Sequence, residues 1–304
     1  MRMQHEMVER FFHWINERHA IYLKKEAGEP FPWTEDGILK RYKFTNPFRE
    51  NDRVTKWIDA NIRKPYADHE NLWFMLCIAR YINWPPTLET MIKGGWWPDD
   101  VGVVDIPFTP DLLTYVLEDI VEHGYKVYTG AYMIRAESDP NKEWYHWTKH
   151  KYIAEIVLGR VWEHRDKFVK RFASNSLEKS WELFQEPYYI GWGPFMAYEV
   201  VTDLRHTRHL NNATDIMTWA NPGPGAMRGI KRLYGLGVNE NRPGFNYGFY
   251  IAVMQYLLES SPNYVGEHVP AMEMRDIEHS LCEFDKYERV RLGQGKPRSL
   301  YVPK

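Results

Sequence analysis

A glycine turn near the middle of the chain has residues suited to holding an anion. It comprises Gly191, Trp192 and Gly193, and Pro194 then occupies the position favoured for the first residue of a helix. Glycines allow a sharp turn, and a helix start presents free N–H groups and the positive end of its dipole. The segment Gln185–Asp203 therefore predicts a helix-hairpin-helix that grips a nucleic-acid phosphate. The alternative is an ordinary connection between two helices, which a lone glycine turn does not exclude.

A second glycine turn follows and again precedes a helix, so that residues 184–235 hold two predicted anion sites. Its glycines are Gly223 and Gly225, and its helix carries Arg228 and Lys231 as cations for the same phosphate contacts. Asp215 lies between the turns, at about the spacing at which helix-hairpin-helix DNA glycosylases place a catalytic aspartate. We therefore predict Asp215 as the proton-transfer group. Its alternative role is to cap a short helix over residues 216–220.

The block from Arg49 to Arg53 concentrates charge in a few residues. Arg49 and Arg53 flank Glu50, a combination that could stabilise a departing anion and move a proton. Three further charged residues are predicted to contact a substrate: Arg18, Glu283 and Lys286. The alternative for each is a surface ion pair, which is the usual fate of such side chains.

Four aromatic residues are candidates to stack on a base or fill the gap that it leaves: Trp33, Phe48, Tyr132 and Trp192. Core packing is the more common role for each of them. Trp192 stands at the tip of the predicted hairpin, so we expect it to be the least committed to the core.

The bulk composition limits the classes of protein. A net charge of −2 argues against a protein that coats nucleic acid nonspecifically, because such binding depends on neutralising phosphates. The hydrophobic content of 44% indicates a folded chain rather than a disordered one. The two cysteines, Cys77 and Cys282, lie within helical patterns and indicate a reducing compartment. No apolar run is long enough to span a membrane and no signal peptide is apparent, so we expect a cytoplasmic protein.

The pattern of apolar residues is helical almost throughout and predicts an all-α protein. Thr34 and Thr109-Pro110 have the residue types of helix starts, and Val127–Ile134 is the one strand-like run. We expect one large helical fold over residues 1–304, with two lobes as the alternative. Two His/Cys spacings, His206 with His209 and His279 with Cys282, lack the companion pairs that a zinc site needs.

Five blocks that run almost the length of the chain carry a resemblance to a known family: Glu17–Ile58, Tyr128–Ile134, Ile190–Leu204, Asn221–Gly235 and Arg275–Tyr301. Together they resemble the phage-associated alpha-glutamyl/putrescinyl thymine pyrophosphorylases, also called amino acid:DNA transferases. That family is related to the helical domain of 5-hydroxymethyl-deoxyuridine DNA kinases. The resemblance implies a fold like that of the helix-hairpin-helix DNA glycosylases.

The resemblance also implies a reaction on double-stranded DNA that carries a modified thymine, in the cytoplasm of a phage-infected host. An amino acid or polyamine would displace pyrophosphate from 5-pyrophosphoryloxymethyl-deoxyuridine. The sequence lacks a G-x-x-x-x-G-K-[ST] loop, so a separate kinase would make that pyrophosphate. Mg²⁺ could assist its departure, although nothing in the sequence requires a metal.

Two other functions remain compatible with the sequence. A DNA glycosylase would use Asp215 to stabilise a sugar cation and would release the modified thymine. A non-catalytic subunit of a modification complex would use the hairpin to bind DNA and would need none of the charged residues for chemistry.

Overall fold

The computed structural model describes residues 2–95, 108–237, 239–240, 242–297 and 299–302. Their secondary structure is helical, and a single bridge between Tyr42 and Leu300 is the only β-type pairing recorded among them. The all-α prediction is therefore confirmed. The chain divides into two compact units: unit 1 is Met1–Asp52 with Asp215–Lys304, and unit 2 is Arg53–Thr214.

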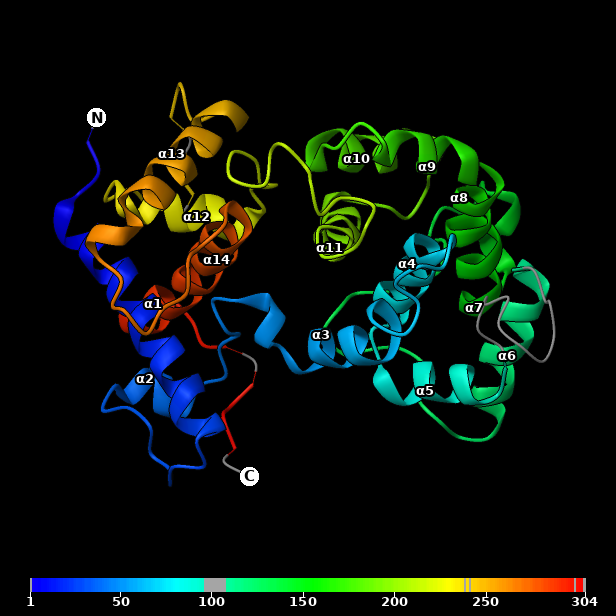
Figure 1. Ribbon diagram of the computed structural model, residues 1–304, viewed down its shortest axis with the longest axis horizontal. Helices are drawn as coiled ribbons and strands as arrows, with labels where there is room; N and C mark the ends of the chain where they lie inside the picture. The colour runs from blue at the N-terminus through cyan, green and yellow to red at the C-terminus, as the bar shows by residue number, and fades with distance from the viewer. Residues whose placement is uncertain (1, 96–107, 238, 241, 298, 303–304) are drawn as a thin grey trace. The chain divides into compact units, whose positions relative to one another are not determined.

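Unit 1 is built around the pairing of α12 (Pro224–Leu233) with α14 (Met274–Arg291), which lie side by side in Figure 1. The glycines of α12 make the close approach possible, since a Cβ at Gly225 would collide with Cys282 Sγ and one at Gly229 with the Leu281 carbonyl. The other elements of unit 1 are α1 (His5–Glu26), α2 (Gly37–Arg41), η1 (Arg49–Asn51), α13 (Tyr247–Ser260) and η5 (Ser261–Asn263).

Unit 2 surrounds α4 (Leu72–Ile82), in which every residue is buried. A helix that is buried on all sides belongs in the centre of a fold, and α4 packs on α11 (Pro194–Leu204), which in turn packs on α10 (Leu177–Phe184). The remaining elements are α3 (Arg53–Ile58), η2 (Asp59–Arg63), α5 (Pro85–Lys93), α6 (Pro110–Glu122), η3 (Glu143–His146), α7 (Lys149–Tyr152), η4 (Ile153–Gly159), α8 (Arg160–Glu163) and α9 (Arg165–Phe172).

Local expectations for the helix starts have mixed outcomes. The start at Thr109-Pro110 is confirmed, because the Thr109 hydroxyl accepts a hydrogen bond from the Leu112 N–H at 3.3 Å. The prediction that Thr34 caps the next helix is wrong. Asp36 caps α2 by accepting from two helix N–H groups, while Thr34 instead accepts from the Asp36 N–H.

Two other local expectations are wrong. Residues 127–134 form no strand, since the structure there is irregular and the Thr129 N–H donates to the carbonyl of Ile82 on α4. Residues 216–218 form a turn and residues 219–220 are irregular, so no helix forms there. The segment Gly94–Phe108, whose sequence predicts a loop, lies mostly outside the described residues.

Candidate functional site

Helix α14 presents a row of chemically active side chains in unit 1. Glu278, Cys282 and Lys286 follow one another at four-residue spacing, and His279 and Glu283 lie beside them at the same spacing. Residues three or four apart lie on one face of a helix. The sequence therefore held a signal for this face, although we assigned a role only to Glu283 and Lys286.

Glu283 is buried and Arg18 is partly buried, and their side chains carry opposite charges. The Glu283 carboxylate accepts from the Thr45 N–H at 2.8 Å and pairs with Lys286 Nζ at 2.6 Å. Burial raises the pKa of Glu283, but the Lys286 cation and the other partners outweigh it and lower the pKa overall. Arg18 donates from Nε and Nη2 to the Phe44 carbonyl, both at 3.1 Å. Burial lowers the Arg18 pKa to about 10, so its guanidinium is charged at neutral pH.

A second group of charges adjoins the same face. Glu50 pairs with Arg275 at 3.5 Å, and Arg49 acts electrostatically on His279 together with Arg275. Burial, aided by these two cations, lowers the pKa of His279 to about 4. The imidazole is therefore neutral at pH 7. Its Nε2 is buried and makes no hydrogen bond to the described residues.

Glu278, in this row of α14, has a pKa suitable for proton transfer near neutral pH. Its side chain is 9% exposed and accepts from the Gly223 N–H at 3.2 Å through Oε1. Burial raises its pKa to about 7, against the opposing effects of the Gly223 N–H, Arg49 and Arg275. A group with this pKa is present in both protonation states at pH 7, which is what a general base or acid requires.

Five of the predicted site residues thus lie in one cluster, which we call the α14 cluster. It comprises Arg18, Arg49, Glu50, Glu283 and Lys286 from the predictions, together with Arg275, Glu278 and His279, which the sequence analysis missed. No group of three or more His, Cys, Asp or Glu side chains able to hold a metal occurs among the described residues.

Other predicted residues have packing or structural contacts. Trp33 is buried and donates from its indole to the Glu29 carbonyl at 2.7 Å. Phe48 is also buried and contacts the His19 ring edge-on. Arg53 begins α3 in unit 2, so the charged block Arg49–Arg53 is divided between the units. Asp215 lies in a turn of unit 1, where its carbonyl accepts from Thr218 and Trp219 N–H groups, and its catalytic role stays a prediction.

The second glycine turn is predicted to bind a phosphate, but in the structure its groups contact other parts of the protein. The Gly223 N–H already holds the Glu278 carboxylate, and Gly225 packs against Cys282. Among its cations, Arg228 pairs with Asp285 at 2.8 Å and Lys231 is buried. The turn therefore binds an anion as expected of a helix start, but the anion is the protein's own carboxylate.

The three residues of the first glycine turn have different structural roles. Trp192 is 2% exposed, and its indole donates to the Val157 carbonyl at 2.9 Å, so the expectation that it stands apart from the core is wrong. Gly191 has φ +88° and accepts from Tyr81 Oη at 2.7 Å through its carbonyl. Gly193 is exposed with open space around it, and it is the N-cap of α11.

Tyr132 lies near the same helix start. Its hydroxyl donates to the buried Glu199 carboxylate at 2.7 Å, and its ring contacts exposed Phe195 edge-on. The start of α11 therefore combines an open N-cap with exposed aromatic surface, and it stays the candidate DNA contact of the hairpin.

Substitution of Gly193 tests this contact. We expect Gly193→Asp to fold normally, because aspartate is a favoured N-cap, but to bind duplex DNA about tenfold more weakly through repulsion of the phosphate. The matched variant Gly193→Asn caps without a charge and should retain most of the affinity. Fluorescence anisotropy with labelled DNA measures both, and equal affinity of the two variants would contradict a phosphate at this position.

A family model described as "5-hmdU DNA kinase, helical domain" matches residues 5–296, which is nearly the whole chain. The chain belongs to this family. A curated relative, the 5-hmdU DNA kinase of Bacillus phage SP10, is 26% identical over 294 residues. The aligned region covers 91% of this chain and 44% of that kinase, so this helical domain spans less than half the length of its relative.

No solved structure matches this helical domain, so its predicted likeness to helix-hairpin-helix DNA glycosylases stays a prediction. The α14 cluster lies within the matched region, as do both glycine turns. None of the described helices is long and apolar enough to cross a membrane.

Proposed function

We propose that this chain is a DNA-modifying transferase that attaches an amino acid or polyamine to a thymine derivative in phage DNA. Family membership supports this proposal, because a relative of the chain is a phage 5-hmdU DNA kinase. The observation that carries the reaction type is the α14 cluster. In it, Arg49 and Arg275 act on the Glu278 carboxylate, whose pKa is raised to about 7, while Arg18 and Lys286 interact with the neighbouring Glu283.

The proposed substrate is 5-pyrophosphoryloxymethyl-deoxyuridine in double-stranded DNA. The amine nitrogen attacks the methylene carbon, the bond from that carbon to the pyrophosphate oxygen breaks, and pyrophosphate leaves with the electron pair. Arg18, Arg49, Arg275 and Lys286 would stabilise the charge that develops on the leaving group. Mg²⁺ bound to the pyrophosphate could add to that stabilisation.

The incoming amine is protonated at neutral pH and must lose a proton to react. Glu278 and Asp215 are the two proposed acceptors, the first from its raised pKa and the second from its place after the hairpin. The reacting base must leave the helical stack to reach a buried group, as in other enzymes that act on bases. The start of α11 would hold a phosphate of the same DNA.

Mass spectrometry of nucleosides tests the proposal directly. The full chain is incubated with duplex DNA that carries the pyrophosphorylated base and with a mixture of amino acids and polyamines. We expect an amine-substituted thymidine, with pyrophosphate released in equal amount and the bond between sugar and base intact. Abasic sites would instead identify a glycosylase, and DNA binding without any product would identify a non-catalytic subunit.

A further inference from the structure

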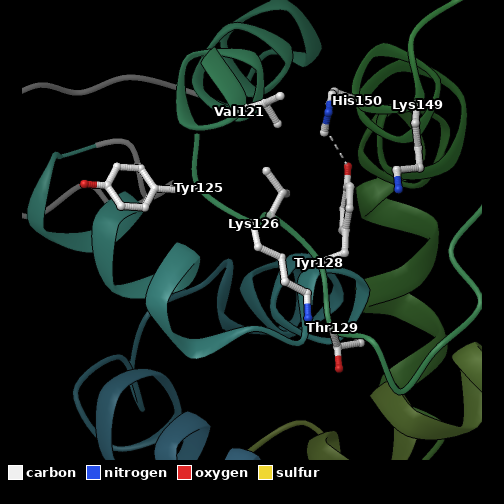
Figure 2. Close-up of a pocket in the computed structure, with 8 residues that line it drawn as sticks. Val121, Tyr125, Lys126, Tyr128, Thr129, Lys149 and His150 are labelled. Carbon is white, nitrogen blue, oxygen red and sulfur yellow. Dashed lines mark hydrogen bonds between the residues drawn. The ribbon is translucent and has the colours of Figure 1, made fainter. Parts of the chain in front are cut away.

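Unit 2 contains a pocket that has no part in the α14 cluster. It has a volume of about 380 Å³ and lies between the end of α6 and the start of α7. The residues that line it are drawn in Figure 2: Val121, Tyr125, Lys126, Val127, Tyr128, Thr129, Lys149 and His150. The size falls within the range of small-ligand sites.

The charge of this pocket is positive. Among the described residues, Lys126 and Lys149 are its two cations and no acidic side chain lines it. Glu118, which acts electrostatically on His150, accepts a hydrogen bond from the Thr148 hydroxyl at 2.8 Å. Burial and Lys149 lower the pKa of His150, so its imidazole is neutral at pH 7. The pocket therefore favours an anion.

Aromatic rings hold the two lysines in place. Lys149 Nζ lies 4.6 Å from the centroid of the Tyr128 ring, and Lys126 Nζ lies 4.2 Å from that of Trp84. Tyr128 is fixed in turn, because its ring stacks on His150 and its hydroxyl lies 3.1 Å from His150 Nδ1. Within the part of the chain that the structure describes, neither lysine forms an ion pair with a carboxylate, so no acid among these residues neutralises their charges.

The same combination of cation and aromatic ring recurs along the following segment. Lys142 and Arg160 lie over Trp144, Lys151 lies over Trp147, and Arg160 also lies over Tyr188. Between Lys142 and Arg171 the sequence has eight Lys or Arg residues and four acidic ones, although the whole chain has a net charge of −2. Clustered cations of this kind attract the phosphates of a nucleic-acid backbone.

We propose that this pocket binds a backbone phosphate of DNA between Lys126 and Lys149, and that the duplex continues over the aromatic and basic segment from Lys142 to Arg160. Tyr125, which is 71% exposed, borders the pocket and would contact the adjoining sugar. This inference rests on the proposed function only in taking DNA as the partner. It gives unit 2 a binding surface that does not depend on the hairpin.

The salt dependence of binding to an unmodified duplex tests the inference. Each phosphate contact contributes about 0.9 to the slope of log affinity against log salt concentration. Because both lysines contact the same phosphate, we expect Lys126→Ala and Lys149→Ala each to reduce that slope by up to about one and to weaken binding about three- to tenfold at low salt. Lys64→Ala is the matched control, because this lysine is exposed in unit 2 and pairs with Asp59 at 2.7 Å.

Equal slopes for the wild type and both pocket variants would overturn the inference. Retained thermal stability of the variants shows that any loss of affinity is not a loss of folding. The nucleoside assay separates this result from the proposed function. If amine transfer occurs and the slopes are unchanged, the proposed transferase function stands and the pocket is not a phosphate site. If the slopes are reduced and no transfer occurs, the pocket is a phosphate site and the proposed transferase function fails.

Discussion

Glu278→Gln is expected to lower the rate of amine transfer about 100-fold or more, which is the usual contribution of a positioned general base. Glutamine keeps the size of the side chain and can still accept from the Gly223 N–H. It cannot take a proton from the amine. Single-turnover assays on pyrophosphorylated DNA would measure the rate, with Asp215→Asn compared in the same assay because both residues are proposed acceptors.

The pH profile of the reaction distinguishes a general base from a structural residue. Burial raises the pKa of Glu278 to about 7, so the wild-type rate should rise with pH up to about 7 and then level off as this carboxylate ionises. The variant should lack that step. Asp276→Asn is the matched control, because burial also raises the Asp276 pKa to about 7, but its carboxylate accepts from the Glu273 N–H in a capping box. A step that persists in Glu278→Gln would exclude Glu278 as the base.

Stability measurements test the same pKa without any assay of activity. The folded-state pKa of Glu278 lies above its ordinary value of 4.5, so ionising this group costs the folded state free energy. Its contribution to the free energy of unfolding therefore falls as pH rises from about 4.5 to about 7. Glu278→Gln lacks this penalty, so its stability relative to the wild type should increase as pH rises from about 4.5 to about 7 and then stay constant. A constant difference between the two proteins would show that the pKa is not raised.

Asp203→Ala is expected to lower the free energy of unfolding of unit 2 by about 3–5 kcal/mol, the range found when one partner of a buried ion pair is removed. Asp203 on α11 pairs with Arg80 on α4, with Oδ1 2.7 Å from Nη2, and lies 3.8 Å from Arg63. The side chains of Asp203 and Arg80 are each 1% exposed and that of Arg63 is 3% exposed. Alanine would leave two guanidinium groups buried without their shared carboxylate.

A surface pair provides the control for this comparison. Glu186 pairs with Lys167 at 2.5 Å, but their side chains are 39% and 47% exposed, so water already screens the charges. Glu186→Ala should therefore cost less than about 1 kcal/mol. Urea unfolding with a probe in unit 2 would measure both variants. Similar losses for the two would mean that the Asp203 pair contributes no more than an exposed one.

The local sequence determined the helical class and several helix starts. Apolar spacing along the chain indicated that its regular structure is helical, and Thr109-Pro110 and Pro194 marked helix starts correctly. These features depend on residues a few positions apart, whose relation along a helix is fixed by its periodicity. The spacing on α14 is of the same kind, and Glu278 and His279 could have been chosen from it.

Burial and long-range pairing could not be obtained from spacing alone. Trp192 stands beside two glycines, which suggested an exposed tip, but the turn folds inward so that its indole reaches Val157. Thr45 meets Glu283 across 238 residues, and Arg80 meets Asp203 across 123. Such contacts are set by which helix faces pack together, and many pairings satisfy the same apolar pattern.

The sequence by itself thus determined an all-helical chain, the two glycine turns and most of the charged residues proposed for the chemistry. Only the tertiary structure decided how those charges are used. It buries Glu278 and so raises its pKa to about 7, and it places the Glu278 carboxylate on the Gly223 N–H of the second turn. It also leaves the N-cap of the first turn open at Gly193. The physical reason is that pKa and access to solvent depend on the neighbours that folding brings together, and these come from distant parts of the chain.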